Sequence, residues 1–423
     1  MIGAPLGALF VEGEIAGLFS GAALTAAMIR VEAALAEAEA EAGVIPAEAG
    51  RAIAEGLAGL EIDPGALAEG TASAGVPVPA LVAALRKALP EEAAAFVHWG
   101  ATSQDIVDTA LVLQYRAALG ILEARAARLI AVLKAASEAH ADLVMAARTR
   151  SQVATPITFG LRAARWAQPV IAEAAALPAL RARLTVQFGG ASGANTSVAP
   201  HGPAVSAGLA ARLGLPDRPA WHTDRGAVQA LGQWAARLGT GLAKMAGDLI
   251  LLGRTGEVTA GIGGGSSTMP QKSNPVAAEA ILTLTRLTAT LAPALSAPHA
   301  EERDGAAWAL EWLTLPQMLA DTGAALAHAI TLAETLRPDP AALRTPLDDG
   351  AALAEAASFA LAPHLGRAEA QALVKEAAEA DAPLIEALQR LTDAPVDWSA
   401  LTPEAVIPAC KAAAAQVFAA ARP

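Results

Sequence analysis

The sequence is poor in cysteine, in aromatic side chains and in positive charge. Cys410 is the only cysteine among 423 residues, so no disulfide can form within the chain and a reducing compartment is natural. Aromatic residues make up 4% of the chain and the formal net charge is −12, which argues against nucleic acid and anionic membranes as partners. An acidic protein can still bind an anionic substrate, but only through a local cluster of basic side chains.

Long apolar runs and a basic leader are missing as well. No uninterrupted apolar stretch is long enough to cross a bilayer. The residues that follow Met1 lack the basic region of a secretion signal. We therefore expect a cytoplasmic protein. His, Cys and Asp nowhere cluster at the spacing of metal ligands, so we expect no metal and no organic cofactor.

Alanine, leucine and glutamate dominate, and alternating β-branched residues are scarce, which favours helix nearly throughout. A chain of this length exceeds one compact core. We predict an all-α protein with an N-terminal helical domain (1–93), a central long-helix domain (94–337) and a C-terminal helical domain (338–423). The strongest period lies in 226–253, where apolar residues recur in alternating steps of three and four. Such heptad seams predict long helices in a bundle, which commonly continues across subunits.

One stretch, 263–275, combines three glycines with reactive side chains. Ser266 and Ser267 supply hydroxyls, and Lys272 and Asn274 supply a cation and an amide. Glycine lets the backbone close on a ligand, and the proline that ends the stretch suits the first turn of a helix. The pattern predicts a mobile active-site loop that ends at a helix N-terminus, where negative charge is favoured.

This stretch has two plainer interpretations. A glycine–serine linker is common, but a linker rarely carries Met-Pro-Gln-Lys-Ser-Asn-Pro in a row. A phosphate-binding loop requires glycine directly before the lysine, and Gln271 occupies that position. The residues alone therefore leave an active-site loop and a linker open.

Two further polar stretches, 97–109 and 145–160, have structural alternatives. Ser103 and Asp105 precede an apolar helical stretch, so they could simply cap a helix. The second stretch could be a basic turn between helices. His98 taken alone would more often be structural, and we favour a structural role for His222 in Trp221-His-Thr-Asp-Arg225.

Residues 265–275 resemble the signature G-S-S-x-M-P-x-K-x-N-P of the fumarase/aspartase superfamily. The stretch from His98 to Asp105 resembles the superfamily block H-x-G-x-T-S-x-D, and 148–160 resembles R-T-x-x-Q-x-A-x-P-x-T-x-G. His-Trp-Gly-Ala-Thr-Ser-Gln-Asp is most similar to the 3-carboxy-cis,cis-muconate cycloisomerase branch. The likeness covers most of residues 15 to 335 and thins after that.

This resemblance implies an all-helical, three-domain subunit in a homotetramer, with long central helices in a shared bundle and each active site drawn from several subunits. It implies reversible lactonisation of a small polycarboxylate, without a cofactor, in aromatic catabolism. Ser266 would be the catalytic acid/base. The substrate would be bound by the following residues: His98, Thr102, Ser103, Gln104, Arg148, Thr149, Gln152, Ser267, Met269, Lys272 and Asn274.

Two positions depart from the superfamily pattern. Arg150 stands where fumarases and related lyases carry His and the cycloisomerases carry Trp, and Glu301 replaces a family His. The alternative enzyme is an adenylosuccinate lyase or related C–N lyase, which shares the signature but is expected to have His at position 150. A catalytically silent helical scaffold is the alternative outside enzymes, and the intact set of Ser266, Lys272 and Asn274 argues against it.

Overall fold

The structure is a computed structural model, and it describes residues 5–261, 264–265, 269 and 272–420. The all-α prediction is confirmed, because helices dominate and the strands of the described residues form only three two-stranded pairs. No helix within the described residues is both long and apolar enough to cross a bilayer. By its internal contacts the chain divides into two compact units. The three-domain division predicted above stays a prediction.

Unit 1 comprises residues 1–124, 176–239 and 284–324. Its helix α2 packs against α3 and α10. The Ser20 hydroxyl caps α2 by accepting from the Ala23 amide at 3.2 Å, and Gly43 follows the helix with a φ of 74°, a conformation that glycine adopts readily after a helix. The helices wholly within unit 1 are α1 (Gly13–Leu18), α2 (Gly21–Glu41), α3 (Ala47–Leu57), α4 (Ala68–Ala74), α5 (Val78–Ala88), α6 (Glu91–Ala94), α9 (Leu177–Arg183) and α10 (Gly202–Leu213).

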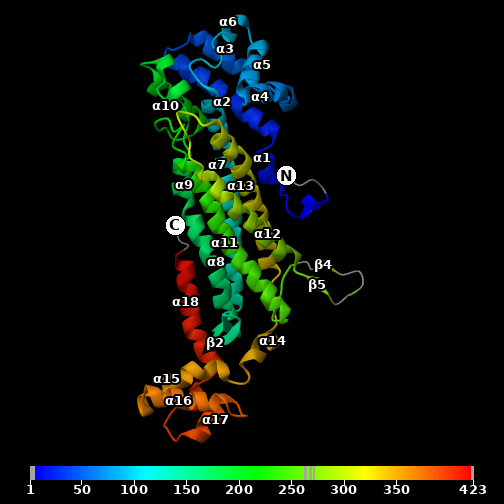
Figure 1. Ribbon diagram of the computed structural model, residues 1–423, viewed down its shortest axis with the longest axis vertical. Helices are drawn as coiled ribbons and strands as arrows, with labels where there is room; N and C mark the ends of the chain where they lie inside the picture. Colours follow the sequence, from blue (N-terminus) through cyan, green and yellow to red (C-terminus); the bar gives the residue numbers. More distant parts are fainter. Residues whose placement is uncertain (1–4, 262–263, 266–268, 270–271, 421–423) are drawn as a thin grey trace. The chain divides into compact units, whose positions relative to one another are not determined.

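Unit 2 comprises residues 125–175, 240–283 and 325–423. Its helix α8 packs against α18, while α15, α16 and α17 form a group with its own apolar core (Figure 1). The helices wholly within unit 2 are α8 (Phe159–Ala175), α14 (Pro340–Arg344), α15 (Ala354–Leu365), α16 (Arg367–Ala378), α17 (Leu384–Leu391) and α18 (Ile407–Ala419). Its strands are β1 (Val144–Thr149), β2 (Gln152–Thr158), β3 (Val258–Thr259), β4 (Gly264–Gly265), β5 (Ser273–Asn274) and β6 (Arg337–Pro338).

Four long helices contribute residues to both units: α7 (Ser103–Ala139), α11 (Gly226–Arg254), α12 (Val276–Leu291) and α13 (Gly305–Glu334). The heptad seam of α11 is confirmed, because every residue of the predicted seam is buried: Val228, Leu231, Ala235, Leu238, Leu242, Met245, Leu249 and Leu252. Within unit 1, α11 can approach its neighbours closely at Gly232, where a Cβ would lie 2.2 Å from Leu295 Cδ1. Small residues at such points let helices pack at short range.

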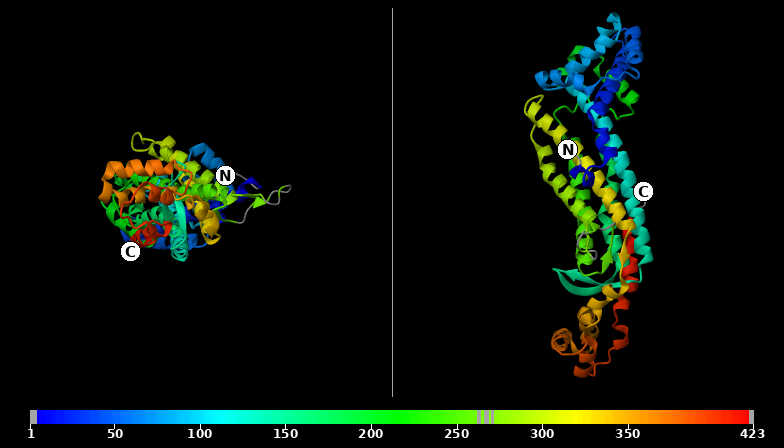
Figure 2. Two further views of the ribbon diagram at one scale, coloured as in Figure 1. Left: turned by 90° about the horizontal axis from the view of Figure 1, so that it is seen from below. Right: turned by 90° about the vertical axis from the view of Figure 1, so that its right-hand side faces the viewer.

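The main departure from the predicted helical pattern is the hairpin β1–β2 (Figure 2, right). The predicted basic turn exists, but it joins two antiparallel strands rather than two helices. Thr149 pairs with Gln152, and the two residues between them, Arg150 and Ser151, have φ values of 50° and 67°. Two successive residues with positive φ match the twist of a tight hairpin turn. The alternation of apolar and polar residues that marks a strand is too short and too irregular in 144–158 to be recognised in an alanine-rich sequence.

Candidate functional site

Several hydrogen bonds from other segments of unit 1 meet at the N-terminus of α7. The Thr102 amide donates to Asp105 Oδ2 at 3.0 Å, so the capping interpretation of Asp105 is confirmed. The same carboxylate also accepts from the amides of Gly189 and Gly190, at 2.9 and 3.0 Å, and from Gln187 Nε2 at 3.0 Å. Asp105 therefore fixes the segment 187–190 against the start of α7.

Asp105 is 1% exposed. Burial raises the pKa of Asp105 to about 6, although the four hydrogen bonds that the carboxylate accepts act to lower it. The side chain is thus mainly ionised at neutral pH, and its negative charge is favoured by the positive end of the helix dipole.

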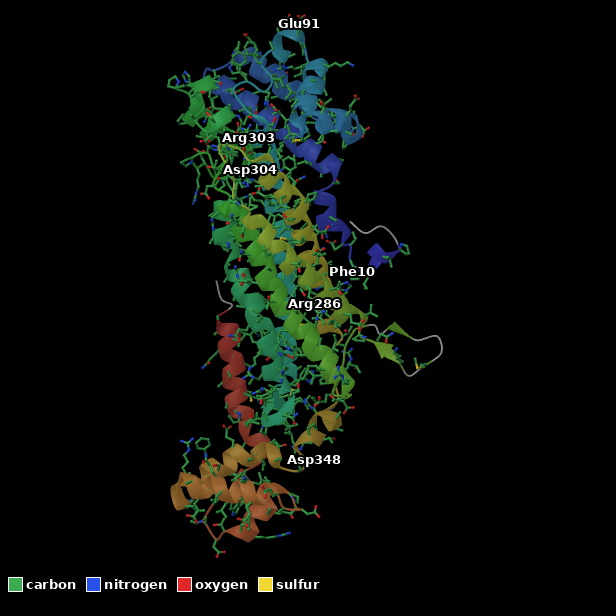
Figure 3. All side chains as sticks on the ribbon, in the orientation of Figure 1. Phe10, Glu91, Arg286, Arg303, Asp304 and Asp348 are labelled. Atoms are coloured by element: carbon green, nitrogen blue, oxygen red, sulfur yellow. The ribbon has the colours of Figure 1, made fainter. Side chains whose placement is uncertain are left out.

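Gln104 is buried and joins two loops of unit 1. Its Nε2 donates to the carbonyl oxygen of His222 at 2.9 Å, and its Oε1 accepts from Arg303 Nε at 3.0 Å. Arg303 and its neighbour Asp304 lie just before α13 (Figure 3). The structure therefore places Gln104 in a supporting network, and a direct contact between Gln104 and substrate stays a prediction.

His98, Thr102 and Ser103 lie close together in the sequence around Gly100, and all three are half-buried. Gly100 has a φ of 70°, and a Cβ there would lie 2.3 Å from Val198 Cγ1, so only glycine fits. Within the described part of the chain, the hydroxyls of Thr102 and Ser103 have no hydrogen-bond partner. These accessible donors are consistent with the predicted carboxylate-binding role.

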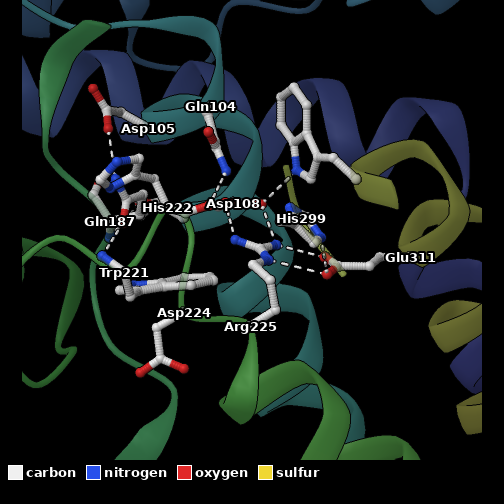
Figure 4. A network of polar contacts seen from close by, with 12 residues as sticks. Gln104, Asp105, Asp108, Gln187, Trp221, His222, Asp224, Arg225, His299 and Glu311 are labelled. Carbon is white, nitrogen blue, oxygen red and sulfur yellow. Dashed lines mark hydrogen bonds and ion pairs between the residues drawn. The ribbon is translucent and has the colours of Figure 1, made fainter. Parts of the chain in front are cut away.

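A buried ion-pair network begins at Asp108, five residues into α7, as Figure 4 shows. Arg225 donates to both oxygens of Asp108, at 2.6 and 3.1 Å, and its other side meets both oxygens of Glu311. Trp308 Nε1 donates to Asp108 Oδ1 at 2.8 Å. The guanidinium also stacks on the Trp221 ring, 4.6 Å from its centroid.

Arg225 stays charged in this network. Burial alone would lower the pKa of Arg225, but the charges and hydrogen bonds of Asp108 and Glu311 outweigh burial and raise it. The sequence alone predicted no role for Arg225 or Glu311. The signal that could have found Glu311 is a charged residue inside the apolar pattern of α13, whereas Arg225 lies in the loop directly before α11 and left no such signal.

His222 is held in place by its neighbours. Its Nε2 lies 3.1 Å from Glu302 Oε2, and a Cβ at Gly193 would lie 2.1 Å from His222 Cε1. These contacts fit the structural role favoured for His222. Glu302, which contacts His222, and Arg303, which contacts Gln104, are therefore both engaged in the support of this loop.

In unit 2, the predicted site residues Arg148, Thr149 and Gln152 lie in the hairpin β1–β2. Arg148 Nη2 donates to Glu257 Oε1 at 3.0 Å, and Glu257 is buried. Thr149 and Gln152 are exposed beside the turn. A cavity of about 300 Å³ next to Arg148 is rich in cations, and the residues that line it are Arg148, Ser151, Arg162, Lys244, Asp248, Leu251, Leu252, Arg254 and Thr255.

The stretch 263–275 is called the signature loop from here on. Its strand β4 pairs with β5 through Gly264–Asn274 and Gly265–Ser273, which makes a second hairpin. Lys272 and Met269 are exposed and Asn274 is half-buried. Helix α12 begins at Val276, directly after Pro275, as predicted. Ser266 and Ser267 lie outside the described residues, so their roles stay predictions.

The predicted site residues therefore fall into two sets, one in each unit. His98, Thr102, Ser103 and Gln104 belong to unit 1, whereas the hairpin and signature-loop residues belong to unit 2. Within the described residues, no three His, Cys, Asp or Glu side chains are grouped so as to hold a metal ion. The absence of a cofactor from the reaction stays a prediction.

Residues 15–287 match the family model described as Lyase. The chain is 40% identical to a 3-carboxy-cis,cis-muconate cycloisomerase of Bradyrhizobium diazoefficiens over 389 residues, which cover 86% of this chain and 86% of that one. It is also 40% identical to the enzyme of the same name from Pseudomonas aeruginosa, with 87% of this chain and 83% of that one covered.

Among solved structures, the chain is similar to 3-carboxy-cis,cis-muconate lactonizing enzyme from Pseudomonas putida, with a TM-score of 0.90 and 33% identity over 99% of each chain. The match to the family model covers more than half of the chain, and the two relatives exceed the identity at which a shared fold is secure. The chain therefore belongs to the lyase family of the fumarase/aspartase superfamily.

Proposed function

We propose that this protein is a 3-carboxy-cis,cis-muconate cycloisomerase, which interconverts its acyclic tricarboxylate and a carboxymuconolactone in the β-ketoadipate branch of aromatic catabolism. The observation that carries the proposal is the extent of the likeness to the cycloisomerases, which includes the segment from His98 to Asp105 at the start of α7. The accessible hydroxyls of Thr102 and Ser103 and the cations of unit 2 suit a substrate with several carboxylates.

In the lactone-forming direction, one substrate carboxylate oxygen attacks a carbon of the conjugated double bond, and a C–O bond forms. The electron pair of that double bond moves to the carbon next to another carboxylate, where an aci-carboxylate develops. A proton then adds to this carbon, so each turnover consumes one proton. The attack is intramolecular, so the enzyme accelerates it by holding the geometry.

Ser266 is proposed as the proton donor, with Lys272 and Asn274 holding the carboxylate that carries the developing charge. Each preorganised donor of this kind is typically worth about 3–4 kcal/mol in the transition state. The exposed position of Lys272 beside the β4–β5 hairpin leaves its ammonium open to a substrate. Closure of this hairpin over the substrate would exclude water and strengthen these contacts.

We also propose a cytoplasmic homotetramer in which each site is completed by several subunits. The long helices expose large apolar side chains that a shared bundle would cover, because Leu251 of α11, Leu287 of α12 and Leu313 of α13 are 55%, 43% and 75% exposed. Light scattering on the purified protein would report the mass of the assembly, and a monomer would contradict this part of the proposal.

The test of the function is turnover of 3-carboxy-cis,cis-muconate, followed by the loss of its ultraviolet absorbance and by proton uptake in a weakly buffered solution. We expect one proton to be consumed per substrate converted. Adenylosuccinate serves as the parallel substrate and should not be cleaved. Cleavage of adenylosuccinate, or silence with both compounds, would overturn the assignment.

A further inference from the structure

A buried carboxylate holds one ring nitrogen of His98. Glu32 Oε1 lies 2.7 Å from His98 Nδ1. Glu32 comes from the middle of α2, and its side chain is fully buried, whereas the His98 side chain is 18% exposed. Within the described residues, the other oxygen of Glu32 has no hydrogen-bond partner. His98 is therefore the one group shown to compensate this buried carboxylate, and the contact fixes the plane of the imidazole.

The backbone around His98 is fixed as firmly as its ring. His98 has a φ of 63°, a conformation that L residues rarely adopt and that persists only where the surrounding structure imposes it. Arg86 Nη2 donates to the carbonyl oxygen of Val97 at 3.0 Å and so holds the preceding peptide. Backbone and ring together leave Nε2 as the nitrogen without a partner among the described residues.

The charges around His98 favour the imidazolium. Burial favours the neutral ring, but the hydrogen bond and charge of Glu32, together with the charge of Asp105, outweigh burial and the opposing charge of Arg86. The pKa of His98 is therefore raised above its usual value. These three groups lie on three different helices: Glu32 on α2, Arg86 on α5 and Asp105 on α7.

A second buried carboxyl on α2 provides an internal comparison. Glu39 lies two helical turns after Glu32 and is also fully buried, but neither of its oxygens has a partner within the described residues. Burial and the charge of Glu32 raise the pKa of Glu39 to about 9, so this side chain is neutral at pH 7. Of the two carboxyls, only Glu32 is linked to the site.

We propose that Glu32 is a positioning residue, which holds His98 so that its Nε2–H faces the substrate and binds one of its carboxylates as an imidazolium. This inference rests on the proposed function for the identity of the ligand. The pairing of Glu32 with His98 stands on geometry alone. A buried acid that orients a histidine from behind is a general device for fixing which nitrogen is free.

Two variants separate the charge of Glu32 from its hydrogen bond. Glu32→Gln keeps an oxygen that can accept from Nδ1–H but removes the charge, so His98 should stay oriented and lose its proton at lower pH. Glu32→Leu removes both and should also free the ring. Glu39→Gln is the matched control, because it changes a buried carboxyl of the same helix that is already neutral and lacks a histidine partner.

The direct readout is the titration of His98 by NMR on protein labelled at histidine Cε1. The chain has only 7 histidines, so the signal of His98 can be assigned from its loss in His98→Gln. We expect the pKa of His98 to fall by about one unit or more in Glu32→Gln and to stay unchanged in Glu39→Gln. The second readout is the pH profile of KM, which should rise about tenfold at pH 7 in Glu32→Gln, with a smaller change in kcat.

A His98 titration that is the same in wild type and Glu32→Gln would overturn the proposal. A shifted titration with an unchanged KM would overturn it as well, because the imidazolium would then not bind substrate. If the wild type does not convert 3-carboxymuconate, the proposed function fails, and the NMR titration still decides whether Glu32 positions and charges His98. The two failures are therefore distinguishable.

Discussion

The predicted site residues at the start of α7 in unit 1 lie among buried, hydrogen-bonded charges, whereas those on the two hairpins of unit 2 are largely exposed. We call the first region the platform: the N-terminal turns of α7 with the residues that bond to it, namely Asp105, Asp108, Gln187, Arg225 and Glu311. Its charged groups are buried and multiply hydrogen-bonded. The hairpins β1–β2 and β4–β5 instead present exposed residues such as Lys272 and Gln152.

This difference separates two tasks. A platform with satisfied buried ions cannot move without leaving charges unpaired, which is costly, so it is suited to fix the shape of a binding surface. Exposed side chains on the hairpins can contact a substrate without leaving a buried charge unpaired, so the hairpins are suited to carry the group that transfers a proton. Variants of the hairpins should therefore change turnover before stability, and variants of the platform should do the reverse.

The sharpest test of this separation is Ser266→Ala in the signature loop. We expect kcat to fall by about 10²–10⁴-fold, because general acid–base catalysis typically contributes that much, while the melting temperature stays unchanged. Ser273→Ala is the control, since Ser273 is an exposed serine in β5 of the same hairpin. Turnover that survives Ser266→Ala would remove this serine as proton donor.

The reverse result is expected for Arg225→Met in the platform. The variant leaves the carboxylates of Asp108 and Glu311 buried without their cation, and breaking a buried ion pair in this way typically costs about 3–5 kcal/mol. Thermal and urea unfolding would measure the loss. Arg225→Lys keeps the charge but cannot serve both carboxylates through a planar fork, so it should be intermediate. An unchanged melting temperature in Arg225→Met would show that the buried ion pairs of the platform do not determine stability.

A smaller effect on activity is expected for Lys272→Met. Lys272 is exposed, so its replacement should leave stability within about 0.5 kcal/mol of the wild type. Loss of a charged hydrogen bond to a substrate carboxylate is worth about 1.5–3 kcal/mol, so kcat/KM should fall by about 10–100-fold. Steady-state kinetics would measure the change, and Lys272→Arg should recover part of it. A full kcat/KM in Lys272→Met would show that this ammonium does not bind substrate.

Much of this arrangement could be predicted from the sequence, because its signals are local. The period of 226–253 predicted the buried seam of α11, and the polar residues 102–105 predicted a helix start. The β1–β2 hairpin was not predicted, because the alternation of apolar residues in it is short and irregular. The ion pairs of Arg225 escaped because they join residues more than 80 positions apart, and no period or spacing encodes such a contact. Glu32 escaped for the same reason, since it is 66 positions from His98.

The smallest expected effect concerns the turn of β1–β2, where the hairpin itself carries backbone strain. Ser151 has a φ of 67° and follows Arg150, whose φ is also positive. Glycine adopts such a conformation without the steric cost of a Cβ, so Ser151→Gly should stabilise the hairpin by about 0.5–1 kcal/mol. The exchange of its amide hydrogens should then slow by about two- to fivefold.

Ser151→Ala is the matched control, because alanine also lacks the hydroxyl but keeps the Cβ, so its hairpin should exchange no more slowly than that of the wild type. If both variants exchange alike, the positive φ is not strained and the turn gains nothing from glycine. If Ser151→Gly slows exchange and lowers kcat/KM together, the strained turn holds the neighbouring residues Thr149 and Gln152 in an active geometry. The β1–β2 hairpin would then also fix the shape of the binding surface, as the platform does, and the two regions would differ only in how strongly they do so.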